Sequence, residues 1–170
     1  MKYSVAQIAY HWLTVVFIAV LVLSGLAYTY DWAENNILSV HQIVGQILIL
    51  VIAVRLGSRL FGHQPVSDKL TPTWESRAAQ VVHLALYAVI VAYLTTGYVA
   101  ASGLRDPMLV APISQSLARS DLGELFLEAH FALKWVLLGL FAIHLAAVAK
   151  HHFWDQDDTL FNMTPTFRKD

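Results

Sequence analysis

The sequence contains no cysteine among its 170 residues. This absence excludes disulfides, thiolate-bound zinc, iron–sulfur clusters ligated by cysteine and covalently attached c-type haem, so any metal must be held by nitrogen or oxygen ligands. Charge is scarce too, at 14% of residues with a net charge of −1. The few basic residues neither cluster on one face nor alternate with aromatics, so nothing indicates a nucleic-acid partner.

Hydrophobic residues, in contrast, make up 57% of the chain, and the mean hydropathy is +0.55. Such a composition is typical of an integral membrane protein, with the lipid bilayer as its main partner. The length allows one compact domain covering residues 1–170.

Four stretches are apolar enough to cross a bilayer, which takes about 20 residues. They run from about residue 8 to 28, 38 to 60, 78 to 104 and 129 to 151. The first is too long for a signal peptide and no clear small-residue cleavage site follows it, so we expect it to be retained. Short connections predict an all-α, up-down-up-down four-helix bundle. No internal repeat is evident.

Lysine and arginine concentrate on one side of these spans. The positive-inside rule therefore predicts that both termini are cytoplasmic. Two arginines near the end of the second span are expected to extend their charged heads to the membrane interface. The residues on this side are Lys2, Arg55, Arg59, Lys69, Arg77, Lys150, Arg168 and Lys169.

The histidines occur at two depths in the predicted bundle. His130 and His144 are fourteen residues apart in the fourth span, which is about 21 Å along a helix and just under four turns, so they share a face. His41 is expected near His130 at the outer side. At the inner side, His11 and His83 are both candidate partners of His144, and the spacing leaves that choice open.

A single histidine near a helix end is commonly an interfacial residue, but ionisable groups inside spans usually mark a site. Two stacked imidazole pairs, without cysteine and without carboxylates in the spans, suit two haems b with axial histidines; zinc or di-iron would favour thiolates or carboxylates. We therefore expect haem in the bundle core.

Several stretches resemble the bacterial cytochrome b561 family and, within it, the superoxide:ubiquinone oxidoreductases. These are IAYHWL (residues 8–13), SVHQIVG (39–45), VVHLALY (81–87), EAHFALKW (128–135) and LFAIHLAAVAKHHFWDQDDTL (140–160). The resemblance covers nearly the whole chain. It implies that one haem b is held by His11 and His144 and the other by His41 and His130, whereas His83 matches a histidine that is not an axial ligand.

The resemblance also implies a reaction in a bacterial inner membrane. Superoxide would give its electron at the outer haem and leave as dioxygen, and two electrons would reduce ubiquinone on the inner side. Lys134, Arg105 and Arg119 are the candidates for attracting the anion. Departures from the family pattern, Leu127 and Ala129, weaken this expectation.

Quinone binding is expected at His83, His151 and Arg77, because histidine can hydrogen-bond a quinone oxygen and transfer a proton. The alternative for His151 is a simple interfacial position. Gly45 is expected to leave room for a porphyrin, and Gly25 and Gly97 to serve helix packing.

Two other functions stay open at this point. One is an electron-carrier cytochrome between the quinone pool and a periplasmic redox protein. The other is a transporter or structural bundle without haem, which would leave the stacked histidines unexplained.

Overall fold

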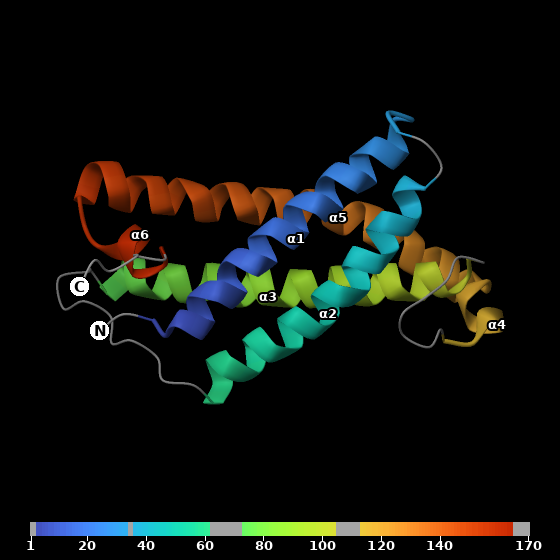
Figure 1. Ribbon diagram of the computed structural model, residues 1–170, viewed down its shortest axis with the longest axis horizontal. Helices are drawn as coiled ribbons and strands as arrows, with labels where there is room; N and C mark the ends of the chain where they lie inside the picture. The colour runs from blue at the N-terminus through green and yellow to red at the C-terminus, as the bar shows by residue number, and fades with distance from the viewer. Residues whose placement is uncertain (1–2, 34–35, 62–72, 105–112, 165–170) are drawn as a thin grey trace.

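The computed structural model describes residues 3–33, 36–61, 73–104 and 113–164, and over these ranges it is helical with short turns (Figure 1). This confirms the all-α fold class. The elements are α1 (Val5–Thr29), α2 (Ile37–Phe61), α3 (Thr73–Ser102), α4 (Gln115–Ala118), α5 (Asp121–Lys150), the π-helical turn η1 (His151–Asp155) and α6 (Thr159–Asn162).

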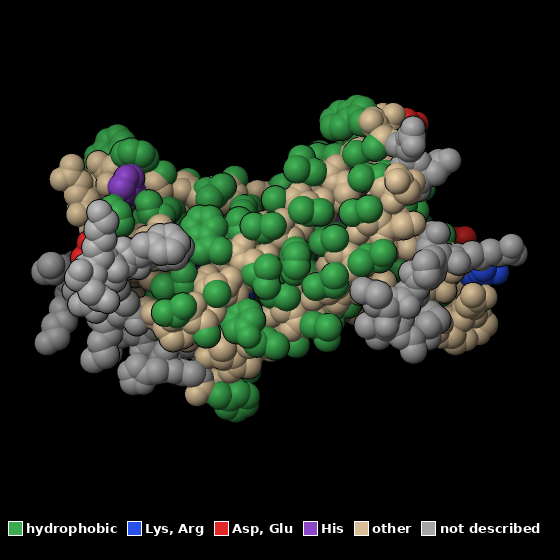
Figure 2. Space-filling model, viewed as in Figure 1, with side chains coloured by type: hydrophobic (Ala, Val, Ile, Leu, Met, Phe, Trp, Pro, Cys, Tyr) green, Lys and Arg blue, Asp and Glu red, His purple; other side chains and the backbone are tan. Residues whose placement is uncertain are grey.

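The four long helices, α1, α2, α3 and α5, are each long and apolar enough to cross a membrane. Large apolar side chains point outward from them, such as Leu23 (66% exposed), Leu84 (71%) and Ile143 (55%). Figure 2 shows hydrophobic side chains covering one face of the molecule, with charged side chains mainly at its two ends. In a lipid environment such a surface is favourable, so the chain is a multi-pass membrane protein.

Helix α1 packs against α2, α3 packs against α5, and α2 also contacts α3. Successive long helices run in opposite directions, and the α1–α2 hairpin lies obliquely across the α3–α5 pair (Figure 1). We call the two ends of the bundle the α4 end and the α6 end, after the short helix that lies at each.

Helix ends follow local signals. Ser4 caps α1 in a capping box with Gln7, which satisfies backbone N–H groups at the start of the helix. Asp121 and Glu124 lie in the first turn of α5 and Lys150 in its last turn, as the helix dipole favours.

Two spans begin earlier than the sequence predicted. Helix α3 starts at residue 73 rather than about 78, and α5 at residue 121 rather than about 129. The added turns carry charged residues, and for that reason they were left out of the predicted lipid-buried spans. These helices therefore extend beyond the apolar core of the bundle.

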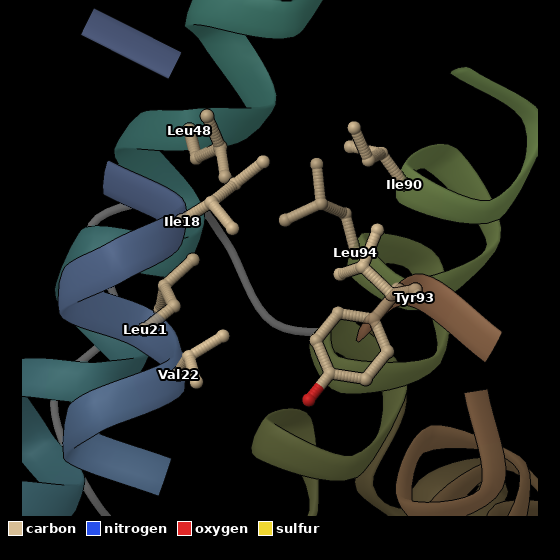
Figure 3. A pocket seen from close by; sticks show the side chains of 8 residues that line it. Ile18, Leu21, Val22, Leu48, Ile90, Tyr93 and Leu94 are labelled. Carbon is tan, nitrogen blue, oxygen red and sulfur yellow. The ribbon is translucent and has the colours of Figure 1, made fainter. Parts of the chain in front are cut away.

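The middle of the bundle is an apolar layer between the two hairpins. It contains a small pocket whose side chains come from both hairpins and point toward one another (Figure 3). The apolar layer consists of Ile18, Leu21, Val22, Leu48, Ile90, Tyr93, Leu94 and Leu137.

Candidate functional site

Helix α5 carries histidines on both sides of the apolar layer. His130 precedes Leu137 by seven residues on the side of the α4 end, and His144 follows it by seven on the side of the α6 end. Seven residues are close to two helical turns, so all three lie on one face of α5. The apolar layer thus separates two histidine sites.

His41 of α2 and His130 of α5 face each other near the α4 end. Their ring centres are 6.3 Å apart and their planes are perpendicular, at 89°. With a metal–nitrogen bond of about 2.0–2.1 Å, and about 1.1 Å from nitrogen to ring centre, two rings that bind one metal from opposite sides have centres about 6.2–6.4 Å apart. We call this pair the His41–His130 site.

Hydrogen bonds on Nδ1 fix the orientation of both rings. Nδ1 of His41 lies 3.0 Å from Ser24 Oγ, whose own proton goes to the Val20 carbonyl. Ser24 Oγ therefore accepts from the ring, and Nδ1 of His41 carries the proton. His130 Nδ1 likewise donates to the Tyr93 carbonyl at 3.0 Å. Both Nε2 atoms are left with a free lone pair, which is the state that metal ligation requires.

Two glycines make room for these rings. A Cβ atom at Gly97 would lie 2.7 Å from Cε1 of His130, and one at Gly25 would lie 3.2 Å from Cε1 of His41. Gly45, expected to face a porphyrin, would meet only Leu21 at an ordinary 3.7 Å. The close approach of α1 and α3 to the histidines therefore depends on Gly25 and Gly97.

The three candidate residues for attracting an anion are placed differently. Lys134 lies in electrostatic range of His130, with its Nζ over the rings of Phe131 and Trp135 at 5.8 and 5.0 Å. Arg119 is exposed just after α4, where its Nε donates to the Gly103 carbonyl. Arg105 lies outside the described residues.

Near the α6 end, His11, His83 and His144 form a second group, which we call the α6-end cluster. The rings of His83 and His144 are 5.3 Å apart between centres, and His11 lies in electrostatic range of both. The structure therefore brings both candidate partners, His11 and His83, to His144. The contacts do not favour one of them over the other.

Arg55 was expected at the membrane interface but points into this cluster. Its Nη2 lies 2.6 Å from Nδ1 of His11, and its guanidinium carbon lies 5.5 Å from the centre of the Tyr87 ring. The half-buried side chain interacts with polar groups inside the bundle, which compensates for its distance from water.

The residues expected to bind quinone do not form one group. His151 Nδ1 lies 2.6 Å from Asp157 Oδ2 and 3.2 Å from Asp155 Oδ2, next to Glu75. His83 is eight residues beyond Glu75 on α3, about 12 Å along the axis. Arg77 is exposed.

Asp157 joins η1 to α6. Partial burial raises the pKa of its carboxyl, but hydrogen bonds from Thr159 and His151 outweigh that effect and hold the pKa below its usual value. The stability from these bonds is therefore present above the ordinary pKa of about 3.8 and is lost as the pH falls through the depressed value. 

Asp157→Asn is accordingly expected to reduce the free energy of unfolding at pH 7 by no more than about 1 kcal/mol, because the pair is partly open to solvent. The thermal unfolding midpoint should fall slightly. At pH 3, which is below the ordinary carboxyl pKa of about 3.8, the difference between the two proteins should shrink. Thermal melting in detergent at both pH values measures this, and a difference that grows toward pH 3 would contradict it.

The donor sets can be compared with the metals they suit. Among the described residues, only Glu75, His151 and Asp155 bring three potential ligand atoms within 4.8 Å of one another. The ammonium of Lys150 already bonds both carboxylates there. The His41–His130 site offers two imidazoles with no third ligand in that range of described residues. Two axial imidazoles fit haem, because the porphyrin supplies the remaining four nitrogens.

Sequence reasoning assigned Gly25 and Gly97 to helix packing and Arg55 to the membrane interface, and it gave no role to Ser24 or Thr96. Their signal is a hydroxyl residue followed by glycine, present once in α1 and once in α3. The residues concerned are Ser24, Gly25, Thr96 and Gly97, together with Arg55 in the α6-end cluster.

Comparison with known proteins adds an independent observation. The family model described as prokaryotic cytochrome b561 matches residues 2–166. Cytochrome b561 homolog 2 of Escherichia coli (strain K12) is 27% identical over 173 residues, covering 95% of this chain and 90% of its own. Cytochrome b561 homolog 1 of the same organism is 25% identical over 173 residues, covering 96% and 97%.

Proposed function

Because the chain belongs to the prokaryotic cytochrome b561 family, whose members are membrane electron-transfer proteins that bind haem b, we propose that it holds two haems and conducts electrons across the membrane. The family membership confirms the resemblance seen in the sequence. The number of haems, their ligands and the substrates are our proposal.

The His41–His130 site carries this proposal. Its two ring centres are 6.3 Å apart, which leaves room for one metal between them. Both rings present an unprotonated Nε2, because the Nδ1 proton is bound by Ser24 Oγ in His41 and by the Tyr93 carbonyl in His130. These contacts orient the rings before any cofactor arrives, which reduces the cost of binding. Haem b, when bound, supplies one-electron oxidation and reduction.

For the second haem we propose His11 and His144 as ligands, as the family resemblance implies. Both residues belong to the α6-end cluster, where His11 lies in electrostatic range of His144. His83 then remains as an imidazole beside the site, in ring contact with His144.

The proposed substrates are superoxide and ubiquinone. Two superoxide anions give two electrons at the α4 end and leave as two molecules of dioxygen. At the α6 end the two electrons, with two protons taken from water on that side, reduce one ubiquinone to ubiquinol. We place the α4 end in the periplasm and both termini in the cytoplasm, following the positive-inside rule.

Residues of the chain have distinct parts in this reaction. Lys134, Arg119 and Arg105 would attract the anion by positive potential. His151, oriented by the carboxylate of Asp157, is placed to donate a proton to reduced quinone. His83 and Arg77 are the other proposed quinone contacts.

A second function is favoured by the charges at the α4 end, where Asp121, Glu124 and Glu128 are all exposed. Carboxylates repel superoxide but attract a positively charged protein surface. The chain could on this basis pass electrons between the quinone pool and a periplasmic redox protein.

Rapid mixing of the oxidised, purified protein with superoxide separates the two functions. Fast reduction of haem, followed by reoxidation when ubiquinone is present, is expected for the superoxide reaction. Haems that reduce with dithionite but hardly react with superoxide would support the electron carrier instead. Protein that is colourless after expression with ample haem would contradict both.

A further inference from the structure

An internal repeat that is not evident in the sequence emerges from the structure. Four residues of α1 recur in α3 with a shift of 72 positions, and five of α2 recur in α5 with a shift of 89. The matches at the histidine sites and the apolar layer are His11 with His83, Ile18 with Ile90, Gly25 with Gly97, His41 with His130, and Leu48 with Leu137.

The repeat is structural as well, because matched residues make matched contacts. His41 bonds the Leu21 carbonyl and Ser24 Oγ. His130 bonds the Tyr93 carbonyl, the counterpart of Leu21 under the same shift. It also lies 3.3 Å from the hydroxyl of Thr96, the counterpart of Ser24.

The apolar layer follows the same rule. Each of its four side chains from α1 and α2 has its counterpart in α3 or α5, so that the layer consists of four matched pairs (Figure 3). The α1–α2 and α3–α5 hairpins are therefore two copies of one unit, and each contributes one ring to the His41–His130 site.

The repeat is broken at one position of the α6-end cluster. His11 and His83 are counterparts, but the counterpart of His144 under the shift of 89 is Arg55. A cluster with full repeat symmetry would hold four imidazoles. This chain holds three imidazoles and a guanidinium.

The hydrogen bond between Arg55 and His11 must break when His11 ligates a metal through Nε2. Arginine can only donate, so Nδ1 of His11 accepts the bond at 2.6 Å and a neutral ring must carry its proton on Nε2. Ligation through Nε2 moves the proton to Nδ1, and Nδ1 can then no longer accept from Arg55. The guanidinium also hydrogen-bonds Tyr87, but it then loses its acceptor on His11 and has donors free for another acceptor at the same depth.

Among the described residues, no carboxylate forms an ion pair with Arg55; the ion pairs there involve Lys150 and His151. Arginine pairs best with a carboxylate, through two parallel hydrogen bonds. Haem b carries two carboxylates of its own, on its propionate groups.

We propose that Arg55 binds a propionate carboxylate of the haem at the α6-end cluster, and that its exchange from His11 to the propionate accompanies ligation by His11. This inference rests on the proposed function, since it requires haem at that cluster. Arg55 is a binding residue for the cofactor and takes the place that a fourth imidazole has in the symmetric arrangement.

The test compares Arg55→Gln, Arg55→Lys and Arg59→Gln in the full-length, haem-loaded protein. Arg59 is a matched control, because its guanidinium carbon lies at the same 5.5 Å from the Tyr87 ring centre and one turn further along α2. Haem content, the midpoint potential of each haem and the resonance Raman propionate bending band are measured. A His41→Ala protein, expected to keep only the haem at the α6-end cluster, assigns the signals.

Loss of a positive charge beside the haem disfavours its reduced form. In Arg55→Gln we expect the midpoint potential of that haem to fall by about 59 mV, which corresponds to a tenfold weaker electron affinity. The propionate band should shift as well. Arg55→Lys should largely restore the potential, and Arg59→Gln should leave the propionate band unchanged.

An unchanged potential and propionate band in Arg55→Gln, with both haems bound, would overturn the inference while leaving the proposed function intact. A propionate band that shifts in Arg59→Gln but not in Arg55→Gln would overturn it as well. Wild-type protein with no haem at the α6-end cluster would instead contradict the proposed function.

Discussion

Protein carrying His130→Ala is expected to bind one haem b in place of two. His130 and His41 face each other as the only two imidazoles of their site in the described chain, and one axial ligand cannot retain a low-spin, six-coordinate iron. The haem-to-protein ratio, measured as the pyridine haemochrome, should fall by about half. His41→Ala should give the same loss, and the double variant should lose nothing further, because both residues act in one unit.

His152→Ala is the matched control for this loss. His152 also follows α5, but its ring packs against Phe153 and Phe161 rather than against another histidine. It should keep both haems. Haem added together with imidazole should restore the lost absorbance in His130→Ala, because imidazole fills the space against Tyr93, on which the His130 ring stacks at 3.9 Å. Two haems retained in both His130→Ala and His41→Ala would refute the pairing.

The second large effect is expected from a single methyl group. In Gly97→Ala the added Cβ would lie 2.7 Å from Cε1 of His130, a distance at which the ring or the helix must move. The ring is also held by the Tyr93 carbonyl, so it cannot move without losing its orienting hydrogen bond. We expect most of the haem at the His41–His130 site to be lost, with the other haem kept.

Two further glycine variants make this prediction quantitative. Gly25→Ala would approach His41 only to 3.2 Å, and nothing lies within 4 Å of a Cβ at Gly139. Haem content at the His41–His130 site should therefore be lowest in Gly97→Ala, intermediate in Gly25→Ala and unchanged in Gly139→Ala, where alanine also favours the helix. Equal losses in Gly97→Ala and Gly139→Ala would point to impaired folding and contradict the steric explanation.

The spans and the histidine depths could be predicted from the sequence because they depend on local rules. Hydrophobic length defines a membrane helix, and helix geometry places His130 and His144 on one face regardless of what packs against them. The family resemblance rests on the same residues. These features need no knowledge of how the helices are arranged around each other.

The residues around the histidines could not be predicted in this way. Whether Gly25 and Gly97 pack against a helix or against an imidazole depends on how far α2 and α5 are rotated. The position of Arg55 depends on Tyr87 and His11, which belong to other helices. Its apparent place near a span end favoured the interface, although the guanidinium lies inside the bundle.

The internal repeat was hidden because identities between the copies are few and lie seven residues apart, as with His11, Ile18 and Gly25. Such spacing maintains one helix face and leaves the lipid-facing positions free to vary. Matched hydrogen bonds made the relation visible where residue identities did not.

The apolar layer has a consequence for membrane energetics. It contains seven aliphatic side chains and Tyr93, with no carboxylate, imidazole or amine through which protons could pass, so in the proposed reaction electrons cross it alone. The two sites are about 21 Å apart along α5, which is roughly two-thirds of a 30 Å hydrocarbon core. Each electron that moves inward therefore works against the inside-negative membrane potential. The energy required is about 1.6 kcal/mol per 100 mV. The reaction is then electrogenic, and its driving force falls as the cell energises its membrane.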